Sequence, residues 1–225
     1  MESLKDLKIN GQGTSGGGKF RDVVIRGSGQ IIGDVECNKY EVLGTGEQKG
    51  DLTAENVMVK GQFKFDGQIN TPVLKVYGES NFHGDIFSDE VAIQGSLKTN
   101  GDLNAEICKI EGGFEIDGLL NVEIIELSMN WPCKVSEIGG TNIKIKNSGK
   151  FSFLGLKNRI SPHSNRSLLE VDTIEADDIY LENTHAKIVR GKNIILGPDC
   201  QIDRVEYQDS FVGHEKSNVE STEKL

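Results

Sequence analysis

The chain has 225 residues, a formal net charge of −10, and a composition that is 36% apolar but only 6% aromatic. The acidic balance argues against nucleic acid or anionic lipid as direct electrostatic partners, because no basic patch is present to neutralise phosphates. Twenty-seven glycines against four prolines indicate many tight backbone turns rather than a disordered chain.

The start of the chain shows no apolar segment after a basic stretch, so we expect no secretion signal. The four cysteines, Cys37, Cys108, Cys133 and Cys200, lack CxxC spacing. This pattern indicates free thiols in a reducing compartment rather than a framework of disulfide bonds. We therefore expect a soluble, cytoplasmic protein.

Residues 1–19 are expected to form a flexible N-terminal segment, because Gly11 to Gly18 reads as a glycine-rich linker. Three apolar residues precede this linker, namely Leu4, Leu7 and Ile9. They are candidates for a peripheral contact with the inner face of the cell membrane. So short a segment is a weak anchor alone, although a polymer could multiply it by avidity.

Residues 20–128 carry a repeat of 17 residues, marked by two glycines six residues apart. The first glycine stands at Gly27, Gly44, Gly61, Gly78, Gly95 and Gly112, and the second at Gly33, Gly50, Gly67, Gly84, Gly101 and Gly118. Two unbroken registers of this kind indicate a repeat architecture.

Counted from the first glycine, apolar residues fall in pairs at positions 3 and 5, 9 and 11, and 14 and 16. A spacing of two is strand periodicity, and glycine supplies the turns at two of the three corners. The sequence therefore predicts an all-β fold, a single-stranded parallel β-helix with triangular coils of about 17 residues. A β-sandwich with glycine turns has no reason to keep this strict phase.

The repeat becomes irregular after Leu127. Residues 129–167 are expected to form irregular coils, because Trp131-Pro132 interrupts the pattern, Ile143 and Ile145 resume it one residue late, and residues 155–167 look like a loop excursion. Residues 168–207 return to alternating pairs and are expected to form C-terminal β-helix coils. Residues 208–225 are polar and are expected to be a disordered tail.

Two features of this chain resemble the bactofilins, the polymer-forming cytoskeletal proteins of bacteria. One is the G-x5-G repeat with aliphatic columns, as in Gly44–Lys60 and Gly95–Glu111, and the other is the closing run Val189–Tyr207. The resemblance spans about residues 20 to 207. It implies a right-handed β-helix, nucleotide-independent assembly into non-polar filaments, membrane association, and scaffolding in cell shape, motility or envelope organisation.

An enzymatic β-helix is the main alternative, but the residues give it little support. The hexapeptide pattern of acyltransferases fails, because the residues before the glycines are mostly polar. A stacked aspartate column could bind a cation or cleave carbohydrate, although a solvated outer face is favoured; it consists of Asp34, Asp51, Asp85 and Asp102. The histidines show no metal-ligand spacing; they are His83, His163, His185 and His214. We expect no catalytic residue, no cofactor and no metal.

Trp131 is either a knob that binds a partner or a plug that covers the coil at the phase slip, and the plug is favoured.

The hypothesis of self-assembly depends on the two ends of the solenoid, because unpaired N–H and C=O groups there template further strand pairing. The candidate interface residues are Val23, Ile25, Ile202, Val205, Tyr207 and Phe211. Phe211 could instead fold over the last coil and cap it.

We therefore expect a self-assembling bacterial cytoskeletal scaffold whose partner is itself, together with a sister bactofilin where the cell has one. A carbohydrate-active or acyltransferase β-helix enzyme and a monomeric binding module stay open as alternatives.

Overall fold

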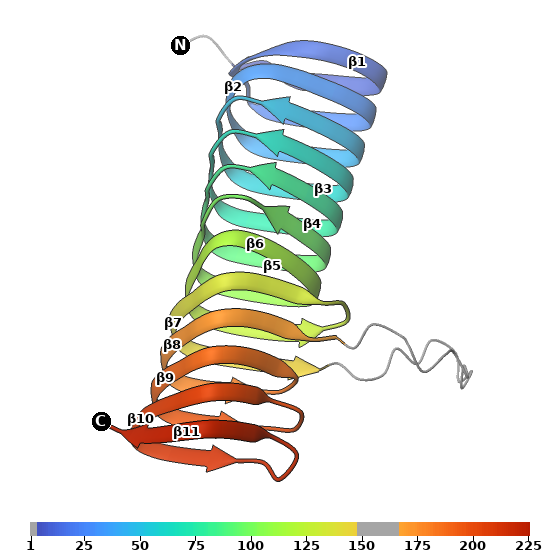
Figure 1. Ribbon diagram of the computed structural model, residues 1–225. Coiled ribbons are helices and arrows are strands. Elements are labelled where there is room, and N and C mark those ends of the chain that lie inside the picture. Colours follow the sequence, from blue (N-terminus) through green and yellow to red (C-terminus); the bar gives the residue numbers. More distant parts are fainter. Residues whose placement is uncertain (1–3, 148–166) are drawn as a thin grey trace, which may run out of the picture.

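The computed structural model describes residues 4–147 and 167–225, and these residues wind into one long parallel β-solenoid (Figure 1). Eleven strands form a single sheet in which each strand pairs with the next along the chain. The strands are β1 (Leu7–Lys19), β2 (Asp22–Lys49), β3 (Leu52–Asp66), β4 (Ile69–His83), β5 (Ile86–Thr99), β6 (Leu103–Met129), β7 (Cys133–Asn147), β8 (Leu169–Leu181), β9 (Thr184–Leu196), β10 (Gln201–Gly213) and β11 (Asn218–Lys224). The predicted all-β solenoid is confirmed, with about 12 turns.

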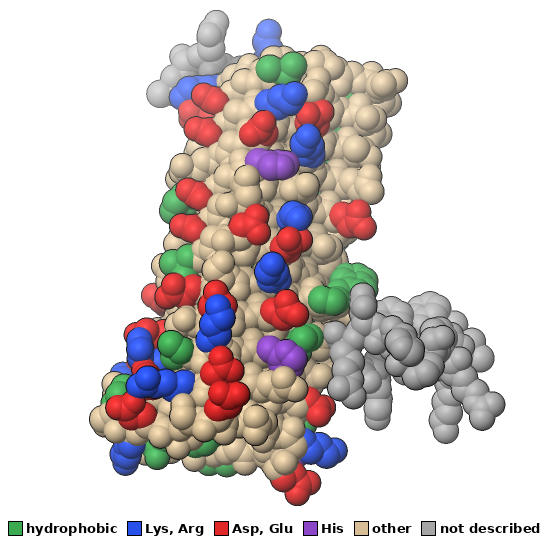
Figure 2. Space-filling model, viewed as in Figure 1, with side chains coloured by type: hydrophobic (Ala, Val, Ile, Leu, Met, Phe, Trp, Pro, Cys, Tyr) green, Lys and Arg blue, Asp and Glu red, His purple; other side chains and the backbone are tan. Residues whose placement is uncertain are grey.

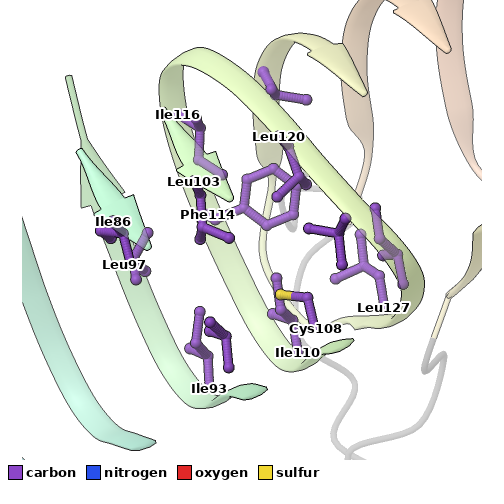
Figure 3. Packing of buried hydrophobic residues seen from close by; sticks show 14 of the residues in the cluster. Ile86, Ile93, Leu97, Leu103, Cys108, Ile110, Phe114, Ile116, Leu120 and Leu127 are labelled. Carbon is purple, nitrogen blue, oxygen red and sulfur yellow. The ribbon is translucent and has the colours of Figure 1, made fainter. Parts of the chain in front are cut away.

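The 17-residue register is kept from β2 to β6. Leu52 pairs with Ile69, Ile69 with Ile86, and Ile86 with Leu103, each in parallel. Figure 3 shows Ile86, Leu103 and Leu120 following one another inside successive coils. Because like residues stack on like, one apolar core runs along the axis of the rod.

Burial alternates along each coil as the apolar pairs predict. In β3 the buried residues are Leu52, Ala54, Val57, Val59, Phe63 and Phe65, and all the residues between them are exposed or half-buried. Three inward pairs per coil are therefore confirmed. Intervening glycines turn the corners: Gly61 has a φ of +134°, and a Cβ there would collide with the carbonyl oxygen of Gly44 one coil earlier.

The phase slip lies where the sequence places it. Glu115 pairs with Lys134, nineteen residues later, so that two extra residues enter at the corner that contains Trp131. One residue is then lost at the next corner, and Ile125 pairs with Ile143. The late resumption at Ile143 is therefore confirmed. Further on the coils tighten, since Leu169 pairs with Thr184 only fifteen residues later. The predicted excursion at 155–167 lies, apart from Ser167, outside the described residues.

Both ends of the rod differ from the sequence-based expectation. Residues 7–19 form β1 instead of a flexible segment, and the predicted disordered tail from residue 208 forms the end of β10 and the strand β11. Glycine-rich and polar segments can form regular strands here, because the neighbouring coil offers a complete row of backbone partners. No helix that could cross a membrane is found among residues 4–147 and 167–225.

Candidate assembly surfaces

The N-terminal end of the rod is the open edge of β1. Within the described residues, β1 pairs with β2 alone, so the N–H and C=O groups on its other side have no strand beside them. Its sequence contains five glycines, no proline and no acidic residue. Proteins commonly protect edge strands with proline, inward charges or a covering element. Lys8 and Lys19 are its charged side chains, and no proline or covering strand blocks the edge within the described residues, so the edge can receive another strand.

Val23 and Ile25, predicted to lie at this end, are instead fully buried in the second coil. Leu7 pairs with Val23, and Ile9 pairs with Ile25, so the first coil covers them on the N-terminal side. The sequence-based expectation misses this coil because a glycine-rich stretch is typical of a flexible linker. The available signal was the spacing itself, since Leu7 and Ile9 stand sixteen residues before Val23 and Ile25.

The three candidate membrane residues do not share one surface. Ile9 is buried and Leu7 is half-buried against the core, whereas Leu4 is 50% exposed. Asp6 pins this segment, because its two carboxylate oxygens each accept a hydrogen bond of 2.8 Å from Arg21. Those hydrogen bonds, with help from Lys8, lower the pKa of the Asp6 carboxyl. Of the three residues, Leu4 alone is placed to meet a lipid surface.

The C-terminal end is formed by β11 and the last part of β10. Ile202 pairs with Val219 and Val205 with Thr222, so β11 covers these two candidate interface residues, and both are buried. Their burial corrects the expectation that they form the outermost surface. The polar composition of 208–225 concealed this strand, in which Val219 packs against the core and the remaining side chains point mainly to solvent.

Tyr207 and Phe211 are the candidates that remain near the C-terminal surface. Both are half-buried against the core, and their ring centroids lie 5.8 Å apart. Phe211 pairs with Ile194 on one side, while β11 pairs only with the stretch from Gln201 to Tyr207. The described residues therefore leave the segment around Phe211 uncovered on its C-terminal side.

The aspartates of the column accept hydrogen bonds from the backbone of the next coil. Asp34 accepts a hydrogen bond of 2.9 Å from the backbone N–H of Asp51, and Asp51 accepts one of 2.8 Å from Gln68. Asp85 and Asp102 do the same for the following residues of the column, at 2.9 and 2.8 Å. Each carboxylate thus satisfies an amide of the next coil at a corner.

The long sides of the rod carry shallow grooves. One of about 560 Å³ is bordered by Trp131, Pro132, Phe114 and Lys98. Trp131 is 53% exposed on the outer face, so it does not plug the coil, which is the role that the sequence favours.

Among residues 4–147 and 167–225, no three His, Cys, Asp or Glu side chains lie close enough together to bind a metal ion. His163 lies outside the described residues.

The four cysteines are free and buried. Burial raises the pKa of Cys37, Cys108 and Cys133 to about 12, and raises that of Cys200 as well. Thiols in this state are inert as nucleophiles.

Comparison with known proteins supports the resemblance. The family model "Bactofilin: Polymer-forming cytoskeletal" matches residues 1–87, which confirms the resemblance for this N-terminal part. The chain is also 40% identical over 91 residues to "Uncharacterized protein YhbF" of Bacillus subtilis (strain 168), covering 40% of this chain and 34% of that protein. A second relative, "Uncharacterized protein YhbE" of the same strain, is 47% identical over 58 residues, covering 26% of this chain and 24% of that protein. No solved structure matches.

Proposed function

Because residues 1–87 match the bactofilins, we propose that this chain is a self-assembling bacterial cytoskeletal scaffold. Its copies stack end to end into filaments and need no nucleotide. The matched segments span about a third and a quarter of the two relatives, so the role of the whole protein is part of this proposal. That role is to organise cell shape, motility or the envelope from the cytoplasm, as a homopolymer or together with a sister bactofilin.

The main structural support for this proposal is that each end strand has an open edge. Inside the rod every strand is held by parallel pairing with its neighbour, and both end strands keep one free edge within the described residues. The half-buried apolar residues that pack on the core are mostly at these ends: Leu7 and Phe20 near one, and Tyr207, Phe211 and Val219 near the other, with Ala105 the exception. Burying them further against a second copy lowers the free energy of the assembly.

Electron microscopy of the purified chain in negative stain tests the proposal directly. We expect filaments at micromolar protein concentration in physiological salt without added nucleotide, and a matching fast-sedimenting fraction in the ultracentrifuge. A chain that sediments as a monomer under these conditions would end the proposal.

A further inference from the structure

A small pocket lies at the corner of the rod where the turns after β8, β9 and β10 stack on one another (Figure 1). It has a volume of about 240 Å³ and is more enclosed than the groove beside Trp131. Its lining includes Leu168, Asn183, His185, Asp199, Gln201 and Lys216. All of these residues belong to one copy of the chain, so the pocket does not depend on self-assembly.

Asn183 brings an amide without a partner to this pocket. Its backbone is held by both neighbouring coils, because its N–H donates a hydrogen bond of 3.0 Å to Pro198 and its carbonyl oxygen accepts one of 3.0 Å from Leu169. The residue is only 8% exposed, and its side chain makes no hydrogen bond within residues 4–147 and 167–225. A buried amide in this state costs free energy until a ligand satisfies it.

Two opposite charges border the same pocket. Asp199 and Lys216 hold the same place in successive turns, each two residues before one member of the strand pair Gln201 and Asn218. Their coils are therefore about 4.8 Å apart. Even so, neither side chain forms an ion pair with a described residue, and both are exposed. Figure 2 shows charges of both signs on the surface of the C-terminal coils. The carboxylate and the ammonium are thus both available to a ligand.

We propose that this pocket binds a free α-amino acid with a short apolar side chain. Such a molecule carries an ammonium and a carboxylate on one carbon, which suits a protein anion and cation held roughly 4.8 Å apart on successive coils. Asp199 receives the ammonium and Lys216 the carboxylate, through charge-assisted hydrogen bonds. The amide of Asn183 can donate to the carboxylate or accept from the ammonium, so the ligand also satisfies this buried group.

The other lining residues limit the size of the ligand. His185 is half-buried and pairs with Gln201 on the next coil, and the two add polar groups to the pocket. Leu168 is half-buried and supplies an apolar contact. Sites for drug-sized ligands have volumes of roughly 300–1,000 Å³. The pocket is smaller than these, which favours an amino acid with a short side chain.

An inorganic anion or a neutral sugar makes poorer use of the same groups. Phosphate would meet the carboxylate of Asp199, which has the same sign of charge. A sugar would leave both Asp199 and Lys216 without an opposite charge. A zwitterion satisfies both signs at once, and it gains two charge-assisted hydrogen bonds in place of neutral ones.

Saturation-transfer NMR on the full chain tests the site, with L-valine as the probe. Magnetisation passes from the protein to the methyl protons of a bound ligand, and polymerisation does not prevent the measurement. We expect a dose-dependent signal that saturates. Isovalerate is valine without the ammonium, and isobutylamine is valine without the carboxylate. Each should bind roughly tenfold or more weakly than L-valine, because it loses one hydrogen bond to a charged group.

Three substitutions assign the groups that hold the ligand. Asp199→Asn should weaken L-valine about tenfold and leave isovalerate unchanged, whereas Lys216→Gln should weaken L-valine and leave isobutylamine unchanged. Asn183→Gly removes the amide, tolerates the φ of +46°, and should weaken L-valine as well. Asp203→Asn and Lys224→Gln are the matched controls, because both residues are exposed on β10 and β11 outside the pocket, and they should bind as the wild type does.

The opposite changes of selectivity in Asp199→Asn and Lys216→Gln cannot come from a general loss of folding, which would weaken every probe alike. The inference is overturned if L-valine gives no saturable signal, if isovalerate or isobutylamine binds as tightly as L-valine, or if glucose binds more tightly. An equal loss of L-valine binding in Asp203→Asn and Asp199→Asn would overturn it too.

Discussion

Two buried polar side chains of this solenoid, Gln48 and Thr99, donate hydrogen bonds to the backbone of the preceding coil. Gln48 is fully buried, donates a hydrogen bond of 2.8 Å to the carbonyl oxygen of Gly33, and accepts one of 3.2 Å from Tyr40. Thr99 bonds the carbonyl oxygen of Gly84 at 3.0 Å in the same way. A corner carbonyl oxygen thus accepts a hydrogen bond from each of these two side chains, which offsets the cost of burying their polar groups.

Substitutions of the neighbouring residues Leu103 and Asp102 test which side chains point into the core and which point outward. Leu103 is fully buried, so Leu103→Asp places a charge without a partner between two coils and should cost about 3–5 kcal/mol of unfolding free energy. Asp102→Asn keeps the oxygen that accepts the hydrogen bond of Leu119 and should cost less than about 0.5 kcal/mol. Urea unfolding measures both, and equal losses would refute the inward and outward assignment.

The buried thiols predict a loss of stability at alkaline pH. The pKa of Cys108 rises from 9.0 to about 12 through burial, so above pH 9 the unfolded chain ionises while the folded chain cannot. Stability is full below pH 9 and is lost as pH rises towards 12, with about 1.4 kcal/mol lost by pH 10 for this thiol.

Cys108→Val is the matched control, because valine occupies the same column at Val57 and Val91. Urea unfolding at pH 8 and pH 10 should show a smaller loss in the variant, by about the contribution of one thiol. An identical loss in both proteins would mean that Cys108 is not shielded as the structure shows.

At the scale of whole strands, the regular elements were predictable and the end elements were not. The columns of β2 to β6 follow from the glycine phase, because each coil repeats the geometry of the last. The end strands β1 and β11 have few apolar residues of their own, and their order comes from hydrogen bonds to one neighbouring coil. From composition alone, these polar or glycine-rich segments are therefore predicted to be flexible or disordered. Four of the six assembly candidates therefore lie one coil inside the end strands, namely Val23, Ile25, Ile202 and Val205, whereas Tyr207 and Phe211 lie near the C-terminal surface.

Two substitutions in the first coil distinguish a structural from a flexible segment. Ile9→Asp should free β1, because Ile9 is buried against Ile25, whereas Leu4→Asp should leave β1 in place. Because stability in a solenoid passes between neighbouring coils, the damage should stay near this end. Hydrogen exchange should show fast β1 amides in Ile9→Asp alone, with β4 and β5 unchanged. Equal exchange rates of the β1 amides in both variants would instead support the expectation that residues 1–19 form a flexible segment.

At the scale of the whole molecule, the rod is a stack whose interior interfaces are nearly alike and whose two end strands each have one unpaired edge within the described residues. Parallel pairing continues from β1 to β11 without a change of direction, and the apolar core runs the full length (Figure 1). Neither end strand is shielded by a helix within the described residues. In the proposed filament, the addition of a further copy would therefore use the same interactions that hold one copy together.

Phe211→Arg separates growth from capping at the C-terminal end. Phe211 is half-buried and its column is uncovered, so a guanidinium there should block the next copy and shorten filaments. Val212→Arg is the matched control, because Val212 is adjacent but 58% exposed on the outer face, and it should leave filament length unchanged. Length distributions in negative stain and sedimentation at equal protein concentration measure the effect. Longer filaments in Phe211→Arg would show instead that Phe211 restrains growth as a cap.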